Sequence, residues 1–276
     1  KDDIIRPLFG WKKEDGTRRY RTCYVEIPRK NGKSNLSAAI ALYMLFADGE
    51  RGAEVISAAG DRGQANIVFN IAQEMINNNA HLRSRAKVLR NVVHYKSSWY
   101  KSISAEAYTK HGLNCHAVIF DELHTQPNRD LWDVLTTSTG ARRQPLIMAL
   151  TTAGHDRASI CYEIHEYAQQ VKAGTINDET FLPVLYAADA DDDWTDEATW
   201  RKANPGYGTI CHKSYFDQAV QNAKANPSMV NSFLRLHLNI WTSAETAWIP
   251  DDIWMKGNKP IPHDRLHTLP CYGGLD

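Results

Sequence analysis

Residues 23–34 read CYVEIPRKNGKS, and the fold of the chain is built outward from them. The apolar run 23–27 is short and partly β-branched, which predicts a buried strand. A tight turn follows over residues 28–32, and a helix begins at Lys33 and Ser34. A strand, a loop and Gly-Lys-Ser at a helix start are typical of a phosphate-binding loop, because the free N–H groups and the helix dipole favour an anion there.

This loop supplies the candidate ATP-binding residues. Lys33 is expected to reach the β- and γ-phosphates, and the Ser34 hydroxyl is expected to ligate Mg²⁺. The pattern departs from the usual one at Ile27, where a glycine normally opens the loop. The alternative is a plain strand-turn-helix with an exposed lysine. The full candidate set is Pro28, Arg29, Lys30, Asn31, Gly32, Lys33 and Ser34.

The segments around the loop predict an α/β fold. Apolar runs at 53–59, 116–122 and 145–150 indicate further buried strands, and helical patterns lie between them. Such alternation predicts a mainly parallel sheet that is covered by helices on both faces. Residues 87–106 alternate well enough for a β-hairpin. After residue 154 helical patterns dominate, which predicts a second, largely helical region.

Composition excludes several classes of protein. The 276 residues are 43% hydrophobic and 23% charged, with a formal net charge of zero, so no global field attracts nucleic acid. Any contact with DNA must therefore come from local basic clusters. The sequence has two such clusters, one of Arg18, Arg19 and Arg21 and the other of Arg83, Arg85, Lys87 and Arg90.

The cysteines indicate the redox compartment. Five cysteines without a Cys-x-x-Cys pair indicate a reducing compartment.

Neither end of the chain reads as the end of a protein. No stretch is apolar enough over its length for a membrane span, and no signal peptide is visible. The sequence lacks an initiator methionine and stops inside an apparent strand. We therefore expect it to be a fragment of something longer.

Two acids close the third predicted strand, and they are the strongest candidates for chemistry. Strand carboxyl ends converge at the ligand in a parallel sheet, so Asp121 is expected to hold the Mg²⁺ beside the loop. Glu122 is expected to orient and deprotonate an attacking water. Thr151 and Thr152 end the next strand and could sense the γ-phosphate. The alternative for the two acids is a strand end capped by solvated carboxylates, and for Thr151 and Thr152 it is ordinary strand-terminus hydrogen bonding.

Hydrolysis also requires a cation near the transferred phosphoryl group. Arg29 lies within the loop and could act in its own subunit. Arg142, Arg143 and Lys110 could instead reach the site of a neighbouring subunit. The sequence leaves this choice open.

One acidic segment resembles a calcium loop and fails the test. Asp189, Asp191 and Asp193 alternate as calcium ligands do, but such a loop needs Gly at 194 and Glu at 200. Both places hold tryptophan. Calcium is therefore rejected.

Several stretches together resemble the large terminase subunit of tailed bacteriophages. The WRKANPGYG part of the fourth stretch is the most particular, and the resemblance extends over nearly the whole chain. In that family the glycine that is absent at Ile27 is commonly missing, and a basic residue such as Arg29 lies early in the loop. The stretches are PRKNGKS (28–34), GLNCHAVIFDELH (112–124), QPLIMALTTAG (144–154), DDDWTDEATWRKANPGYG (191–208), AWIP (247–250) and GGLD (273–276).

The resemblance implies a fold and an organisation. The fold is an α/β P-loop NTPase of the additional-strand, catalytic-glutamate type, with a helical lid or linker subdomain. Residues 1–154 would form the ATPase core, 155–265 the helical subdomain, and 266–276 the start of a ribonuclease-H-like nuclease.

The resemblance also implies residue roles. Lys33 and Ser34 would act on phosphate and Mg²⁺, Asp121 on the metal, and Glu122 as catalytic base. Thr151 and Thr152 would belong to the coupling motif that links hydrolysis to movement. Asp276 would be the first metal-binding acid of the nuclease.

The implied function is an ATP-driven motor that moves double-stranded DNA into a procapsid, with a nuclease in the full-length protein. Its expected partners are DNA, the portal protein, the small terminase subunit and other copies in a ring of five. It would act in the host cytoplasm and transiently on the procapsid. The alternatives are a helicase, because DELH also resembles the Asp-Glu-x-His box, and a non-catalytic module that binds DNA or capsid.

Overall fold

The computed structural model describes residues 2–105, 112–242 and 255–257. Its centre is an eight-stranded sheet in the order β3-β4-β5-β2-β6-β7-β1-β8. The strands from β5 to β8 in this order are parallel, and β4 and β3 extend one edge with antiparallel pairs. The strands are β1 (Thr22–Glu26), β2 (Glu54–Ala59), β3 (Lys87–Leu89), β4 (Val92–Tyr95), β5 (Ser98–Ser104), β6 (Ala117–Asp121), β7 (Leu146–Thr151) and β8 (Phe181–Leu185).

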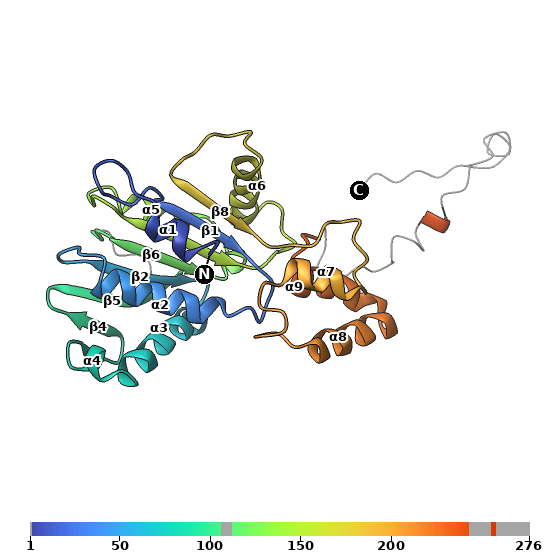
Figure 1. Cartoon of the computed structure of the whole chain (residues 1–276), viewed down its shortest axis with the longest axis horizontal. Helices are drawn as coiled ribbons and strands as arrows, with labels where there is room; N and C mark the ends of the chain where they lie inside the picture. The colour runs from blue at the N-terminus through green and yellow to red at the C-terminus, as the bar shows by residue number, and fades with distance from the viewer. Residues whose placement is uncertain (1, 106–111, 243–254, 258–276) are drawn as a thin grey trace, which may run out of the picture.

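Helices cover both faces of this sheet (Figure 1). Helices α1 (Ile5–Gly10), α2 (Lys33–Phe46) and α3 (Arg62–Asn77) lie on one face, with the short α4 (Ala80–Arg83) after them. Helices α5 (Asp130–Thr137) and α6 (Ile160–Lys172) lie on the other. The predicted α/β class with a mainly parallel sheet is therefore confirmed. No helix in the described part of the chain has the length and apolar character needed to cross a lipid bilayer.

The position of β7 decides which residues meet. It lies between β1, which leads into the phosphate loop, and β6, which carries the acids. This is the inserted strand that the additional-strand type of P-loop fold requires, and it was predicted only through the family resemblance. Because β1, β7 and β6 are parallel, their carboxyl ends lie at one edge of the sheet.

A second, helical unit stands beside the sheet (Figure 1). It contains α7 (Glu197–Ala203), α8 (Lys213–Ala225) and α9 (Val230–Leu238), with 3-10 turn η3 (Pro227–Met229) before α9. Its own apolar core is built around three aromatic side chains, those of Trp200, Phe216 and Phe233. The Trp200 and Phe216 rings stack with centroids 5.4 Å apart.

The division between the two units differs from the predicted boundary at residue 154. Helix α6 packs on the sheet, and β8 pairs with β1 in register, so both belong to the sheet unit. The sheet unit therefore continues through Leu185. The predicted nuclease segment 266–276 lies outside the described residues. The segment predicted as a hairpin over 87–106 is a three-stranded meander of β3, β4 and β5, and β5 joins it to the rest of the sheet by pairing with β2.

A buried ion pair ties the amino ends of the strands together. The Arg18 and Asp48 side chains are 0% and 3% exposed, and Arg18 Nη1 donates to Asp48 Oδ1 at 2.7 Å. His116, just before β6, lies 2.8 Å from Asp48 through Nε2. Burial alone would raise the pKa of Asp48, but the hydrogen bonds from His116 and Arg18 outweigh it and hold that pKa below its usual value.

We expect Asp48→Asn to lower the free energy of unfolding by about 3 to 5 kcal/mol, because it leaves Arg18 buried without a countercharge. Glu179→Gln is the matched control, since Glu179 pairs with Arg19 at the surface, and it should cost less than about 1 kcal/mol. Urea denaturation at pH 7 measures both. The lowered pKa of Asp48 also means that this stabilisation persists above pH about 4 and is lost as pH falls further. Equal effects of the two substitutions would contradict a stabilising role for the buried pair.

Candidate functional site

The phosphate loop links β1 to α2 and contains two left-handed residues. Gly32, the residue before α2, has φ of 79°, and Lys30 has φ of 66°. Gly32 is therefore required by backbone conformation, since a side chain there is strained. No side chain caps the first N–H groups of α2 among the described residues, so they stay available to an anion.

Lys33 turns its ammonium inward and is only 7% exposed. Its Nζ donates to the Thr152 hydroxyl at 2.6 Å and to the carbonyls of Ile27 and Pro28 at 3.1 and 3.3 Å. Burial lowers the pKa of Lys33, and the charges of Glu122 and Asp121 oppose that shift. The loop and the end of β7 are therefore held together by one ammonium group.

Asp121 ends β6 and faces the start of α2. Ser34 Oγ donates to Asp121 Oδ2 at 3.4 Å, while Oδ1 is buried and has no hydrogen-bond partner among the described residues. Burial, followed by the neighbouring charge of Glu122, raises the pKa of Asp121 to about 6. A hydroxyl beside a carboxylate with an unused oxygen fits an oxygen-preferring cation such as Mg²⁺.

Glu122 has an unusual backbone that aims its carboxylate at the loop. Its φ and ψ are 51° and 56°, which is the left-handed region. A non-glycine residue held in this region is strained, and such strained residues cluster at functional sites. Its Oε1 lies 3.6 Å from Lys33 Nζ, and its Oε2 lies 3.3 Å from His124 Nδ1. The acids predicted at the end of β6 therefore do meet the loop.

His124 lies beside the Glu122 carboxylate, and the sequence analysis did not identify it as a site residue. It lies in 3-10 turn η2 (Leu123–Thr125), and its backbone N–H donates to Thr151 Oγ1 at 3.1 Å. Its Nδ1 is also 3.1 Å from that hydroxyl. Burial lowers the pKa of His124 to about 4, so the ring is neutral near pH 7. The only signal in the sequence was its place two residues after Glu122.

Thr151 and Thr152 both contact this network. Thr151 accepts from His124, and the Thr152 hydroxyl accepts from Lys33 and donates to the Ile27 carbonyl at 3.3 Å. The end of β7 thus touches both the loop and the acidic turn. Their assignment to a coupling motif stays a prediction.

Asn239 and Glu26 form a buried junction behind the loop that the sequence did not indicate. Asn239 ends α9 with φ of 60°, and its Oδ1 accepts from the Ala153 N–H at 2.7 Å. Its Nδ2 donates to the Tyr186 carbonyl at 2.8 Å and to Glu26 Oε1 at 3.3 Å. Glu26, at the end of β1, is 1% exposed and also receives hydrogen bonds from the side chains of Tyr24, His165 and Trp241.

The helical unit also touches the loop directly. Asn31 Nδ2 donates to Asn204 Oδ1 at 2.8 Å, and Asn31 Oδ1 accepts from the Gly206 N–H at 3.0 Å. The Arg29 N–H donates to the Leu236 carbonyl at 3.0 Å. A cavity of about 590 Å³ opens between the two units, and it is lined chiefly by the loop, Glu122, His124, residues of α3 and Ile210.

The candidate cations occupy different places. Arg29 is exposed and lines the cavity. Arg142 lies instead at the amino ends of the strands, where its guanidinium binds Glu50 and the carbonyls of Gly52 and Asn114. Each of its nitrogens already donates to this edge, which is a structural role within its own subunit, and its role at a neighbouring subunit's site stays a prediction.

The remaining site predictions cannot be placed at the cavity. Arg143 is exposed at the same end as Arg142, and its Nη2 donates to the Asp15 carbonyl at 3.1 Å. Lys110 and Asp276 lie outside the described residues.

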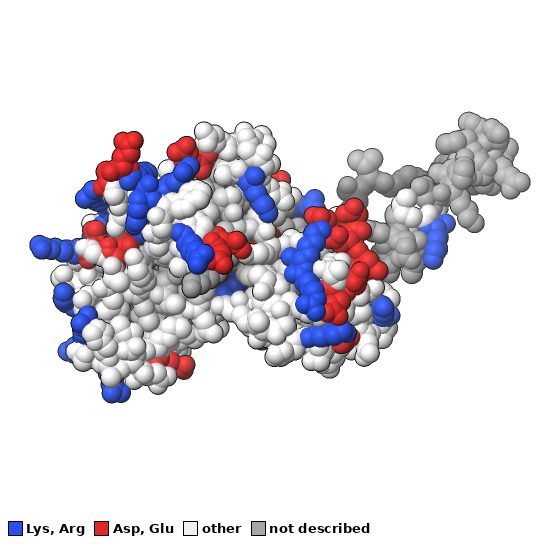
Figure 2. Space-filling model, in the orientation of Figure 1, with Lys and Arg blue, Asp and Glu red and all other residues white. Residues whose placement is uncertain are grey.

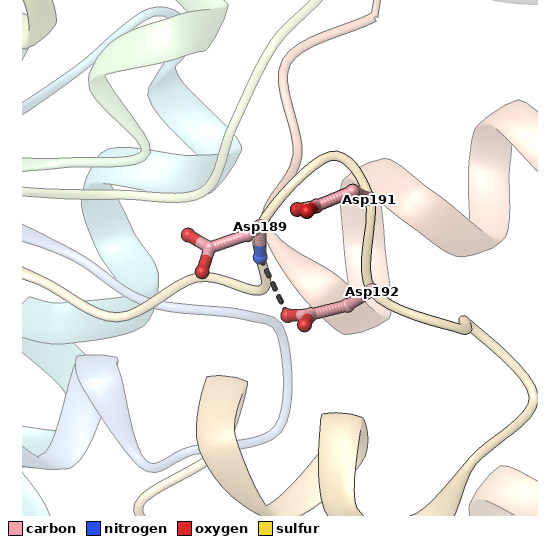
Figure 3. Close-up of side chains that lie close together, drawn as sticks. All are labelled: Asp189, Asp191 and Asp192. Carbon is pink, nitrogen blue, oxygen red and sulfur yellow. Dashed lines mark hydrogen bonds between the residues drawn. The ribbon is translucent and has the colours of Figure 1, made fainter.

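The acidic loop before α7 brings three carboxylates together (Figure 3). Asp192 accepts from the Asp189 N–H at 2.8 Å, and Asp191 lies above them. The Lys202 ammonium binds Asp189 at 2.5 Å and Asp192 at 2.6 Å. One lysine of the same unit therefore offsets part of the negative charge of these acids.

Two family models match the chain. "Terminase large subunit, ATPase domain" matches residues 3–170, and "Terminase large subunit, endonuclease domain" matches residues 175–273. The chain is 32% identical over 269 residues to the terminase large subunit of Enterobacteria phage HK97, which covers 91% of this chain and 50% of that protein. It is also 32% identical over 166 residues to Protein YmfN of Escherichia coli K12, which covers 60% of this chain and 36% of that protein.

Solved structures agree with these matches. The crystal structure of the HK97 large terminase has a TM-score of 0.77 at 28% identity, over 87% of this chain and 49% of that one. The large terminase of a thermophilic bacteriophage, in complex with ADP, has the same fold, with a TM-score of 0.56 at 12% identity, over 86% of this chain and 52% of that one. The chain thus spans about half the length of these two terminases.

We expect Asp121→Asn to stabilise the ligand-free protein at pH 7 by about 2 to 3 kcal/mol, since the folded state raises the pKa of this carboxyl from 3.8 to about 6. A raised pKa adds stability below pH about 4 that is lost as pH rises through about 6. The wild type should therefore lose stability over this window, and the variant should not share that loss. Thermal unfolding between pH 4 and 7 measures it, with Asp217→Asn, an exposed acid, as control. Parallel pH profiles for wild type and Asp121→Asn would contradict the assignment.

Proposed function

Because the chain belongs to the terminase large-subunit family, we propose that it binds and hydrolyses ATP at the phosphate loop to drive packaging of double-stranded viral DNA into a procapsid. One observation carries this proposal. The Lys33 ammonium and the Glu122 carboxylate approach to 3.6 Å although they follow β1 and β6, with β7 between them. ATP hydrolysis needs a cation that binds the phosphates and, close to it, a group that orients the attacking water.

Nucleotide binding requires Lys33 to change partners. Its ammonium now binds the Ile27 and Pro28 carbonyls and the Thr152 hydroxyl. An arriving phosphate offers stronger, charge-assisted hydrogen bonds. Lys33 therefore exchanges neutral oxygens for phosphate oxygens, while the N–H groups at the start of α2 receive the rest of the negative charge.

Ser34 and Asp121 would hold a Mg²⁺ ion at the same place. When bound, the ion would neutralise charge on the β- and γ-phosphates. The buried Asp121 carboxylate with an unused oxygen is suited to this, because a cation favours its ionised form and reverses the effect of burial on its pKa. The Ser34 hydroxyl already points at that carboxylate.

Glu122 is the general base in this mechanism. Its strained turn presents one carboxylate oxygen to Lys33 and the other to His124. Once Lys33 moves to phosphate, Glu122 Oε1 is released to accept a proton from water. The neutral His124 lies beside the other oxygen, which has no hydrogen-bond partner among the described residues, and it adds no competing positive charge.

Arg29 is the proposed cation from the same subunit, since it is exposed on the wall of the cavity. A neighbouring subunit would contribute a second cation, and Lys110 remains a candidate. Stabilisation of transition-state charge by such a side chain is worth several powers of ten in rate.

Coupling to movement would run through the end of β7. When Lys33 leaves Thr152, the hydroxyl loses its donor, and the adjacent Ala153 N–H is held by Asn239 at the end of α9. A change at Thr152 therefore reaches the helical unit through the next residue along the chain. This is the role we assign to Thr151 and Thr152.

The remaining partners follow from the family. We propose a ring of five copies on the portal protein, recruitment of DNA with the small terminase subunit, and DNA cleavage by a nuclease in the full-length protein. Action in the host cytoplasm and on the procapsid belongs to the same proposal. The comparisons offer no support for a helicase, and the contact network around Lys33, Asp121 and Glu122 argues against a non-catalytic module.

Glu122→Gln should leave ATP binding within about threefold of wild type and reduce turnover at least about 100-fold, since only the base is lost. Lys33→Ala should instead abolish binding, because it removes the cation for the phosphates. Nucleotide titration and phosphate release measure the two effects separately. Glu166→Gln, on the exposed side of α6, is the matched control. Near-normal turnover in Glu122→Gln would assign the base to another residue.

Asn239→Gly should uncouple hydrolysis from packaging. Glycine tolerates the backbone φ of 60°, so the fold is less disturbed than by alanine. The substitution deletes the amide that holds Ala153 and, with it, the contacts to Tyr186 and Glu26. In the full-length protein we expect ATP turnover within about threefold of wild type and a packaging rate at least about tenfold lower, as for a coupling free energy of one to three kcal/mol. An unchanged ratio of DNA packaged to ATP consumed would refute the connection.

A further inference from the structure

One segment carries positive charge without any negative charge. Between Glu74 and Glu106 the sequence contains no aspartate or glutamate, in a chain whose basic and acidic residues are balanced at 32 each. The same segment contains six lysines and arginines, so it departs locally from that balance. They are Arg83, Arg85, Lys87, Arg90, Lys96 and Lys101.

We call these six residues the basic edge. They lie on α4, on the strands β3 and β5, and in the turns beside α4 and β4. All six are exposed. Lys87 pairs across the sheet with His94, which pairs with Trp99, and Lys101 follows on the same face of β5. Arg90 and Lys96 lie in the two turns that join these strands. In Figure 2 the surface over α4 and β4 shows separate blue groups and little red.

No other charge in the described residues neutralises the basic edge. None of its six side chains makes an ion pair with a described carboxylate, whereas Arg129, Arg201 and Lys213 each pair with an acid one helical turn away. Arg83 donates to a backbone carbonyl, and Lys101 lies over the Trp99 ring at 4.4 Å. Contacts of this kind leave the positive charge uncompensated.

We propose that the basic edge binds the phosphate backbone of duplex DNA. This proposal rests on the proposed function, in which DNA moves past the protein. β5 has seven residues and so spans about 23 Å, which corresponds to about seven base pairs of duplex. Lysine and arginine side chains spread along such a length read phosphate rather than base sequence, as a motor requires.

The alternative is protection of an edge strand, since lysine on an exposed strand prevents pairing with other chains. Lys87 on β3 fits that explanation. Lys101 does not, because β5 is paired on both sides, with β4 and β2. Arg83 and Arg85 also lie outside any strand. Edge protection therefore accounts for a minority of the six charges.

The basic edge is also placed where DNA contact can respond to nucleotide. β5 runs parallel to β2, and β2 runs parallel to β6, so the carboxyl end of β5 lies at the same edge of the sheet as Asp121. Lys101 lies midway along β5, three residues before that end. DNA held there is two strands away from the acidic turn.

The test uses the full-length protein with the double substitution Lys87→Glu and Arg90→Glu. Fluorescence anisotropy of a labelled duplex of about 30 base pairs is measured across a range of potassium chloride. We expect affinity at least about tenfold lower, and a slope of log K against log salt that is smaller by about two, since each lost phosphate contact removes about one unit. Lys12→Glu with Lys13→Glu, two exposed lysines beside an acid, is the matched control and should change neither quantity.

Lys96→Gln with Lys101→Gln provides a second variant that removes charge without reversing it. Its loss should be smaller and in the same direction. DNA-free ATP turnover should match wild type in every variant, which separates this inference from the proposed hydrolysis. The proposed DNA binding would be overturned if both double variants kept the wild-type affinity and salt slope, or if they lost portal binding while DNA binding stayed intact.

A wild-type protein that binds DNA but hydrolyses no ATP would contradict the proposed hydrolysis and leave the DNA-binding inference standing.

Discussion

The burial of the Lys33 ammonium is the constraint on which the rest of the site depends. A buried cation must be surrounded by acceptors, because leaving it unpaired costs several kcal/mol. The acceptors here come from the end of β1 and from Thr152 at the end of β7, so the loop and β7 are held in one arrangement. A phosphate competes for the same ammonium. Anion binding at the loop would therefore change the hydrogen bond that Lys33 makes to Thr152 at the end of β7.

The strand order makes this competition productive. With β7 between β1 and β6, the acids of β6 approach the loop from one strand away, and Asp121 still meets Ser34 at 3.4 Å. The left-handed conformation of Glu122 turns its carboxylate toward Lys33, where a phosphate would compete for the same ammonium. The strain at Glu122 and the inserted strand are thus parts of one arrangement.

The sequence predicts features that rest on short motifs better than it predicts contacts between distant segments. The loop, the sheet class and the meeting of Lys33 with Asp121 and Glu122 were predictable, because each rests on a short motif or on the convergence of parallel strand ends. The place of α6 and β8 was not, since helical texture after residue 154 says nothing about which unit it packs on. Glu26 and Asn239 are 213 residues apart, and only the folded chain shows their contact. The role of Arg142 stays a prediction, because an arginine before a strand looks the same in the sequence whether it serves a neighbouring subunit or binds carbonyls of its own.

Two attachments of the helical unit join it to the parts of the site that contact Lys33. One joins Asn31 in the loop to Asn204 and Gly206, and the other joins Ala153 after β7 to Asn239. The segments that carry Asn204 and Asn239 flank α8 and α9, so they belong to one unit with one apolar core. If the loop and β7 shift by different amounts when Lys33 changes partners, a well-packed unit cannot stretch between them. Such a unit would move as one rigid body, and every surface of it would move together.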